Sequence, residues 1–379
     1  MNLLRAVLIF CSGLTAAAAA PAPTAPATPA DKMDVWRSGV RGANTAWKRN
    51  EADLRVLRER FGANVARLLG NTTPLRAATA PYAFREENWA LLHRVCDTAR
   101  QVGLYVVIDP HTTPGTVKPT TTNPQDVFWK DPQYQTLLLA TWRRLAREFK
   151  GRPEVIGYDL LNEPSILADA PVGSPGDWNV LVRRLIQVIR TEDPDTPIVI
   201  EPPVVMRAGK RVHNRISGLA YLSLDWGDTR VVYSPHVYEP HPFTHQGVNN
   251  QPFGLTYPGC VTKERAADGT VREVTWDRAE LERVLAPAAE FARAQHAVIF
   301  MGEFSANRLA PGGDRYVQDL LSVFEQYGFS WAYHSFREAA IWDSELGTDA
   351  KNRTPLPDSA RTKILREAMA ANRLYLPAP

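Results

Sequence analysis

From about residue 34 onward, short apolar runs alternate with longer stretches that have helical periodicity. Runs such as Tyr105-Val-Val-Ile and Val298-Ile-Phe-Met are continuously apolar, which is typical of strands buried on both faces. The predicted strands are Arg37–Ala43, Asn64–Leu69, Leu104–Asp109, Val155–Leu161, Ile198–Glu201, Val231–His236, Val298–Glu303 and Phe329–Phe336.

Helical patterns fill most of the intervals between these runs. The predicted helices are Glu51–Arg60, Arg85–Gln101, Gln133–Lys150, Asp177–Thr191, Asp277–Gln295, Asp314–Tyr327 and a last one over Ser359–Asn372. The fifth connection, around Ile216–Asp225, has the poorest helical pattern. Strands that each lead into a connection of this kind predict a single-domain α/β fold, the (β/α)₈ or TIM barrel, over residues 34–379.

An open, doubly wound sheet is the alternative for such a pattern. That fold usually brings a glycine-rich first turn that binds phosphate. The first predicted strand instead runs into Gly42-Ala-Asn-Thr, without either of the common glycine-rich phosphate motifs. The barrel is therefore favoured, and it predicts that the active site lies at the carboxyl ends of the strands.

The first residues differ in character from the rest. Arg5 precedes an apolar run and then five alanines at 16–20, a pattern typical of a secretory signal peptide over residues 1–20. A Pro/Ala-rich linker over residues 21–33 follows. We therefore expect an exported protein, secreted or periplasmic, that has no membrane segment after cleavage.

Composition narrows the function further. Lys+Arg 44 against Asp+Glu 41 leaves a net charge of only +3, without a basic cluster that would indicate nucleic acid as a partner. After export two cysteines remain, Cys96 and Cys260, too few for a disulfide framework, and their pairing is left open. We expect a monomeric enzyme without a cofactor.

Polar residues gather at the predicted carboxyl ends of the strands: Asn44, Arg67, Asp109, His111, Asn162, Glu163, Glu201, His236, Tyr238 and Glu303. Glu163 and Glu303 each end a strand that otherwise carries apolar or small residues. A charge there is costly unless it faces the mouth of the barrel. Hydrolysis of a glycosidic bond requires such a pair of carboxyl groups, one as acid and one as nucleophile.

Four motifs around this pair occur in chain order. They are Arg67 in Asn64-Val-Ala-Arg-Leu, Asn162-Glu163-Pro164, His236-x-Tyr238 and Gly302-Glu303-Phe304. Together they resemble glycoside hydrolase family 5, the cellulase family, from roughly residue 36 to 340.

The resemblance implies a retaining mechanism in which Glu163 is the acid/base and Glu303 the nucleophile. It implies that Asn162 binds the sugar 2-hydroxyl, that Arg67 and Tyr238 contact Glu303, that His236 lies near Glu163, and that His111 reaches the sugar hydroxyls. The mechanism further requires a raised pKa for Glu163 and a low pKa for Glu303.

The stretch after the eighth strand departs from the family pattern. Many relatives have Trp-x-x-Trp there, in which the second Trp supports the sugar, but this chain has Trp331-Ala-Tyr-His334. Trp331 and His334 are predicted to bind substrate. His334, Phe336 or Trp342 could supply the aromatic platform.

Other readings remain beside the glycosidase. A metal-dependent barrel hydrolase could use Asp109, His111 and His236, and a barrel that has lost activity could still bind carbohydrate. For Glu201 a structural salt bridge is expected. His241 and His245 could touch substrate, but packing of their loop is the favoured interpretation. The predicted substrate is a β-linked glucan polysaccharide or oligosaccharide, with mannan, xyloglucan and exopolysaccharide as alternatives.

Overall fold

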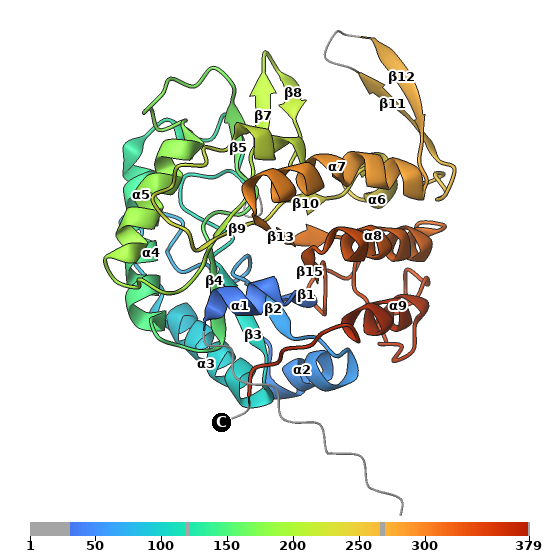
Figure 1. Ribbon diagram of the computed structural model, residues 1–379, viewed down its shortest axis with the longest axis horizontal. Coiled ribbons are helices and arrows are strands. Elements are labelled where there is room, and N and C mark those ends of the chain that lie inside the picture. The colour runs from blue at the N-terminus through green and yellow to red at the C-terminus, as the bar shows by residue number, and fades with distance from the viewer. Residues whose placement is uncertain (1–30, 119–121, 266–269, 378–379) are drawn as a thin grey trace, which may run out of the picture.

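Eight parallel strands close into a barrel in the computed structural model, which describes residues 31–118, 122–265 and 270–377 (Figure 1). In the order around the barrel, they are β1 (Arg41–Ala46), β2 (Val65–Leu69), β3 (Tyr105–Asp109), β4 (Val155–Asp159), β6 (Ile198–Ile200), β9 (Val231–Tyr233), β13 (Val298–Met301) and β15 (Ser330–Tyr333). The pairing of β15 with β1 closes the ring, with Arg41 opposite Trp331. The predicted (β/α)₈ barrel is confirmed.

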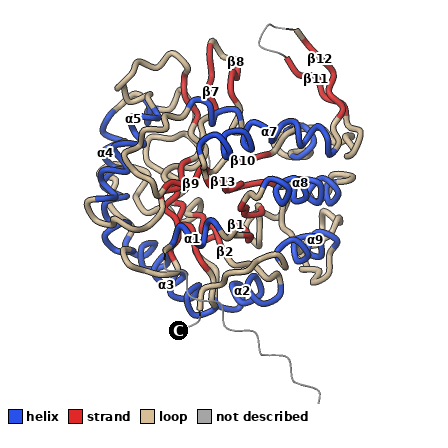
Figure 2. The backbone as a smooth tube through the Cα atoms, in the orientation of Figure 1, coloured by secondary structure: helices blue, strands red, loops and turns tan. Residues whose placement is uncertain are grey.

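A ring of helices surrounds the strands (Figure 2). Its members are α2 (Glu51–Arg55), which continues into the π-helical turn η1 (Val56–Arg60), α3 (Glu86–Val102), α4 (Pro132–Phe149), α5 (Trp178–Arg190), α7 (Arg278–Gln295), α8 (Gly313–Tyr327) and α9 (Ala360–Met369). Aspartates at the starts of α4, α5 and α7 accept hydrogen bonds from backbone N–H groups of the first turn, as N-caps do. Each predicted helix is present, with its ends shifted by no more than a few residues.

The start of the domain differs from the prediction. Helix α1 (Lys32–Arg37) occupies the end of the predicted linker and the first residue of the predicted strand Arg37–Ala43, and β1 begins only at Arg41. Trp36 explains the helix, because its indole nitrogen donates to the Ile156 carbonyl at 2.7 Å and its ring packs against Phe300. Helix α1 therefore covers the end of the barrel where the strands begin. The predicted signal peptide and residues 21–30 lie outside the described residues.

The fifth connection contains no α-helix among its described residues. It contains β7 (Val204–Arg207), β8 (Lys210–His213) and the 3₁₀ turn η3 (Ser217–Tyr221). β7 and β8 form a hairpin that joins β5 (Ser165–Leu167) in a small separate sheet, drawn at the top of Figure 1. The poor helical pattern of this connection is therefore explained by a hairpin and a 3₁₀ turn in place of an α-helix.

Other short elements extend the loops between strands and helices. They are the 3₁₀ turn η2 (Val127–Trp129), the helix α6 (His241–Thr244) and the hairpin of β11 (Val261–Arg265) with β12 (Val271–Thr275). A pair of short parallel strands, β10 (His236–Val237) and β14 (Glu303–Phe304), prolongs the barrel wall and puts His236 directly opposite Glu303. Gly302 permits this approach, because a Cβ atom there would lie 2.3 Å from the Ser234 hydroxyl.

The core has two layers. Apolar side chains from the strands and from α1 fill the barrel interior, whereas a larger cluster lies between the strands and the helices.

Cys96 and Cys260 are both buried and free, so they do not form the disulfide that the sequence left open. Among the described residues, no helix has the length and apolar character needed to cross a bilayer.

Candidate active site

A cavity of about 520 Å³ opens at the end of the barrel where the strands finish. Most of the predicted site residues line it, namely His111, Asn162, Glu163, His236, Tyr238, Glu303 and His334. They come from segments that follow five different barrel strands, and only the closed barrel brings these segments together. Arg67 lies beneath them.

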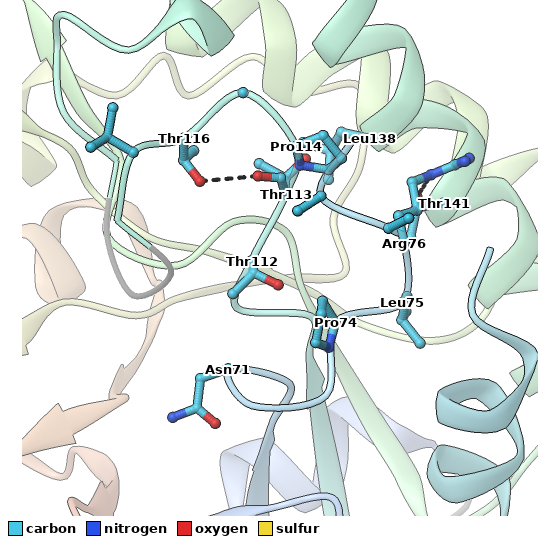
Figure 3. A pocket seen from close by; sticks show the side chains of 14 residues that line it. Asn71, Pro74, Leu75, Arg76, Thr112, Thr113, Pro114, Thr116, Leu138 and Thr141 are labelled. Atoms are coloured by element: carbon cyan, nitrogen blue, oxygen red, sulfur yellow. Dashed lines mark hydrogen bonds between the residues drawn. The ribbon is translucent and has the colours of Figure 1, made fainter. Parts of the chain in front are cut away.

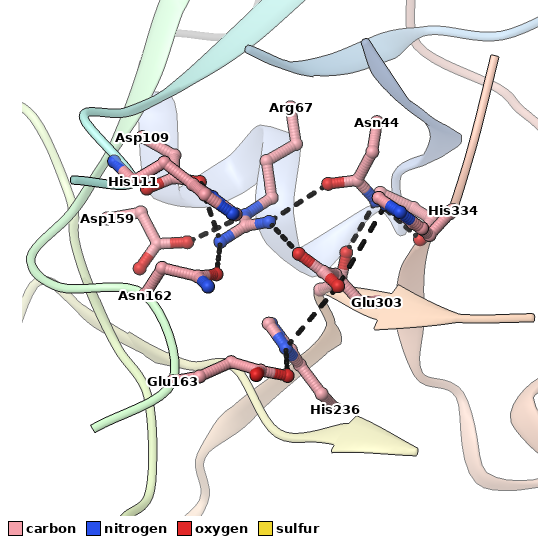
Figure 4. A network of polar contacts seen from close by, with 12 residues as sticks. Asn44, Arg67, Asp109, His111, Asp159, Asn162, Glu163, His236, Glu303 and His334 are labelled. Carbon is pink, nitrogen blue, oxygen red and sulfur yellow. Dashed lines mark hydrogen bonds and ion pairs between the residues drawn. The ribbon is translucent and has the colours of Figure 1, made fainter. Parts of the chain in front are cut away.

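The Arg67 guanidinium is the centre of the polar network under the cavity (Figure 4). It is fully buried and donates to Glu303 Oε1 at 2.8 Å, Asn162 Oδ1 at 2.8 Å and Asp159 Oδ2 at 2.8 Å. Its Nη2 also lies 2.9 Å from Glu201 Oε1, which is the structural salt bridge expected for that residue. The single cation therefore holds several strand ends in fixed relative positions.

The carboxyl groups around Arg67 differ in the direction of their pKa shifts. Burial raises the pKa of Asp159 to about 6, against the opposing effect of Arg67. Burial, reinforced by the neighbouring Asp159, raises the pKa of Glu201 well above its usual value. One arginine cannot balance every carboxylate in this cluster, and the pKa values of Asp159 and Glu201 therefore rise above those of isolated carboxyl groups.

Glu303 is held in the ionised form. Burial alone would raise its pKa, but coulombic interactions with His236, His334 and Arg67 outweigh burial and bring the pKa well below the usual value. Tyr238 donates its hydroxyl to Glu303 Oε2 at 2.9 Å. Burial and then the Glu303 charge raise the pKa of Tyr238, so its hydroxyl keeps the proton that it donates. These are the contacts that the family resemblance implied for Glu303.

Glu163 has a different environment from the predicted one. Its backbone N–H donates to Glu201 Oε2 at 2.8 Å, and its φ of +47° is a left-handed conformation that costs free energy in a residue with a side chain. His236 Nδ1 lies 3.1 Å from Glu163 Oε1, as expected, but Arg215 Nη2 donates to Glu163 Oε2 at 2.6 Å.

This arginine contradicts the predicted protonation of Glu163. Burial favours a raised pKa, but Arg215 and His236 outweigh it, so that the pKa of Glu163 is lowered. The prediction of a raised pKa in the free enzyme is therefore wrong. The pKa of Glu163 is lowered by Arg215, a cation from the fifth connection. The sequence of that connection has no helical or strand pattern from which the position of Arg215 could be predicted.

The two glutamates face each other across a short gap. One carboxylate oxygen of Glu163, one ring nitrogen of His236 and one carboxylate oxygen of Glu303 all lie within 4.8 Å of one another. The carboxyl groups of a retaining glycosidase are ~5–5.5 Å apart, whereas an inverting enzyme needs more room for a water molecule. The spacing between Glu163 and Glu303 fits the shorter of these two separations.

Among the described residues, Asp109, His111 and His236 do not form a group with metal-ligand spacing. His111 Nδ1 bonds to Asp109 Oδ2 at 2.6 Å, and Asp109 also contacts Arg67 at 3.0 Å. Burial would lower the pKa of His111, but the Asp109 charge outweighs it and raises the pKa. Within the described ranges, the group with metal-ligand spacing is Glu163, His236 and Glu303, and it contains neither Asp109 nor His111.

The residues of β15 and of the loop after it divide between core and cavity. Trp331 is fully buried and packs edge-on against Phe304, so the prediction that it contacts substrate is wrong. Alternation along the strand turns Trp331 toward the helices and its neighbour Ala332 into the barrel. Phe336 is also buried, against Phe61. His334 lines the cavity as predicted, and Trp342 lines it beside His334.

Several lining residues were missed or set aside in the sequence. His241 and His245, expected to pack within their loop, line the cavity and stack on each other at 3.7 Å. The missed residues are Asn71, Lys118, Arg211, Arg215, Glu239 and Glu338. The stretch 202–224 contains no Asp or Glu beside its basic residues, and this was the available signal for Arg211 and Arg215.

A second cavity of about 270 Å³ adjoins the first and shares Asn71 with it. Its walls are mostly prolines, threonines and aliphatic side chains, including Pro74 and Leu138 (Figure 3). Arg76 is the charged residue of its lining, and it donates to Thr141. This cavity has no carboxylate, so the acid/base chemistry belongs to the larger one.

Comparison with known proteins agrees with this geometry. The family model described as Cellulase (glycosyl hydrolase family 5) matches residues 28–340. The chain belongs to glycosyl hydrolase family 5. As a member of family 5, it is a glycoside hydrolase that acts on O-glycosyl bonds of an oligosaccharide or polysaccharide, and the resemblance seen in its motifs is confirmed.

Curated relatives carry related names. Cellodextrinase A of Ruminococcus flavefaciens is 27% identical over 274 residues, covering 71% of this chain and 73% of the relative. Endoglucanase C of Acetivibrio thermocellus is 24% identical over 278 residues, covering 67% of this chain and 74% of the relative.

Solved structures share the fold. A hyperthermophilic endo-β-1,4-glucanase in complex with substrate aligns with a TM-score of 0.67 at 21% identity, covering 88% of this chain and 99% of the other. Endoglucanase Cel5A of Thermotoga maritima aligns with a TM-score of 0.64 at 22% identity, covering 89% of this chain and 99% of the other.

Proposed function

We propose that this family 5 enzyme hydrolyses β-linked glucan by a double displacement between Glu163 and Glu303. The observation that carries the proposal is the pair itself, with oxygens within 4.8 Å, one of the two carboxylates being held by Arg67 and Tyr238. The names of the relatives, cellodextrinase and endoglucanase, support a glucan substrate.

The first half-reaction forms a bond between a Glu303 oxygen and the anomeric carbon. The glycosidic C–O bond breaks, and the leaving oxygen takes the proton of Glu163. The low pKa of Glu303 keeps its lone pair available, and Tyr238 and Arg67 orient it. Asn162, which Arg67 holds at 2.8 Å, is placed by this proposal at the sugar 2-hydroxyl.

In the second half-reaction the roles of Glu163 reverse. Its carboxylate takes a proton from water, whose oxygen attacks the anomeric carbon and releases Glu303. Arg215 and His236 favour this ionised form of Glu163, so they assist the second step. His111 and His334, which line the cavity, are proposed to contact the sugar.

The test replaces each glutamate separately and adds azide. Glu303→Gly removes the nucleophile, so hydrolysis should collapse for every substrate, and azide should give a glycosyl azide of inverted configuration. Glu163→Ala should lower turnover of a natural glucan about 10²–10⁴-fold but affect an activated aryl glycoside less. Azide should accelerate this variant and give a product of retained configuration.

NMR of the anomeric proton reads out both variants. Opposite results for the two variants would show that the two roles are exchanged. An inverted wild-type product without rescue by azide would contradict the double displacement.

We also propose that the protein acts outside the cytoplasm. The pattern of residues 1–20 supports export, and a relative in Xanthomonas campestris is named major extracellular endoglucanase. N-terminal sequencing of the protein from the exported fraction would test it, and a mature protein that still begins at Met1 would contradict cleavage.

A further inference from the structure

The cavity has a basic side that a neutral glucan does not require. Lys118, Arg211 and Arg215, together called the cationic wall below, line it next to Glu163. Lys118 follows β3, and the two arginines follow β6, so the wall comes from the two neighbours of β4 in the barrel. β4 is the strand that leads into Glu163.

Among the described residues, two members of the wall have no acidic partner. Arg215 is bonded to Glu163 at 2.6 Å, but Lys118 and Arg211 are exposed and make no ion pair with any of the described residues. Burial and then the charges of Arg211 and Arg215 lower the pKa of the nearby His241, which is consistent with a positive potential on this side. A glucan would offer these cations only hydroxyl groups.

The position of the wall relative to the acid gives its place along the substrate. Glu163 protonates the oxygen of the leaving sugar, so the leaving part of the chain lies on the side of Glu163. Trp342 and Glu338 belong to the loop after β15, which stands across the barrel from β4 in the strand order. The cationic wall therefore borders the sugars that leave.

We propose that the natural substrate is an anionic β-glycan whose negatively charged sugars bind the cationic wall on the leaving-group side. An arginine guanidinium matches an oxyanion in geometry and charge, as in a uronate carboxylate or a sulfate ester. This inference rests on the proposed hydrolysis and adds the class of substrate.

The test compares polymers that differ only in charge. Cellulose partly oxidised at C6 carries glucuronate units, and reduction of those carboxylates returns the same chains in neutral form. The enzyme should have a higher kcat/KM for the oxidised polymer, and added salt should remove much of the difference because it screens exposed charges. Cellulose sulfate in a third arm distinguishes the two oxyanions.

Matched variants locate the effect. Arg211→Gln and Lys118→Gln should each reduce the ratio of kcat/KM for oxidised over reduced polymer about threefold, the effect of one exposed charge pair. Arg207→Gln and Lys210→Gln remove the same charge from exposed positions of the β7–β8 hairpin that do not line the cavity, and they should leave the ratio unchanged. The melting temperature checks that every variant folds.

Mass spectrometry of the products tests the side of the cleft. Cleavage gives the leaving part of the chain a new non-reducing end. If the sugars that bind the cationic wall are charged, glucuronate should be enriched at or near that end. Enrichment at the new reducing end would overturn the placement.

Equal or better hydrolysis of the reduced polymer would overturn the anionic substrate and leave the glucanase proposal standing. Hydrolysis of none of the polymers would overturn both. A stronger preference for the sulfated polymer, lost in Arg211→Gln, would support the anionic substrate and assign the oxyanion as sulfate.

Discussion

Arg215 sets the ionisation of Glu163, the proposed acid of the reaction. The mechanism needs a protonated Glu163 when the leaving group departs, yet Arg215 and His236 outweigh burial and favour its carboxylate. The pKa values of both glutamates are lowered, so the window in which Glu163 is protonated and Glu303 is ionised lies at acid pH. We therefore expect the free enzyme to work best in acid.

Replacing Arg215 should move this window. In Arg215→Gln the pKa of Glu163 rises, because a charge that favours the carboxylate is removed. The alkaline limb of kcat/KM, which reports loss of the acid's proton in the free enzyme, should shift to higher pH, while the acid limb of Glu303 changes less. The pH profile with an unactivated substrate measures both limbs. Arg207→Gln, on the same connection, is the control, and an unshifted alkaline limb in Arg215→Gln would contradict the assignment.

At the scale of elements, the loop after β15 supplies the aromatic side of the cavity. Trp342 lies against His334, with ring centroids 5.5 Å apart, and against His245 at 5.2 Å. Phe336, which the sequence offered as a possible substitute for His334, packs against Phe61. The exposed face of a sugar ring can therefore contact Trp342 and His334 but not Phe336.

Substitutions of Trp342 and Phe336 should differ in their effects on catalysis and stability. Trp342→Ala should lower kcat/KM about tenfold with little change in melting temperature, because an aromatic contact with the sugar is lost. Phe336→Ala should cost ~3–5 kcal/mol of stability, as large-to-small changes in a core do. Kinetics and thermal unfolding of both variants, with His334→Ala beside them, test this. Full activity in Trp342→Ala would transfer the platform to His334.

At the scale of the whole molecule, helix α1 acts as the base of the barrel. Trp36 is fully buried, donates to Ile156 and contacts Phe300, so one side chain links strands β4 and β13 from below. The active site lies at the opposite end of the same strands. Damage to α1 should therefore affect stability before it affects the chemistry.

Trp36→Ala should cost ~3–5 kcal/mol of unfolding free energy. Denaturant unfolding measures that loss, and kcat at a temperature where the variant stays folded should remain near the wild-type value. Val212→Ala, on the exposed strand β8, is the control and should change neither quantity. A large loss of kcat in folded Trp36→Ala would mean that the base of the barrel also shapes the site.

The reaction as a whole should not depend on a metal. Each proposed role belongs to a side chain, so activity should survive EDTA. Zn²⁺ added in excess should inhibit, because Glu163, His236 and Glu303 have ligand atoms within 4.8 Å and a bound ion would block both carboxylates. Initial rates after dialysis against EDTA, with and without Zn²⁺ or Mn²⁺, measure this. Loss of activity that a metal restores would favour the metal-dependent alternative.

The sequence by itself determined the barrel and the residues at its strand ends. Continuous apolar runs identified the buried strands, and polar residues directly after them, such as Glu163 and Glu303, had to meet at one end because parallel strands in a barrel finish there. The neighbours of these glutamates in three dimensions were decided by tertiary structure. Arg215 reaches Glu163 from a loop without periodicity, and Trp331 turns away from the cavity because strand alternation assigns each face by register. Such positions depend on loop paths and on packing between distant segments, which local sequence patterns do not encode.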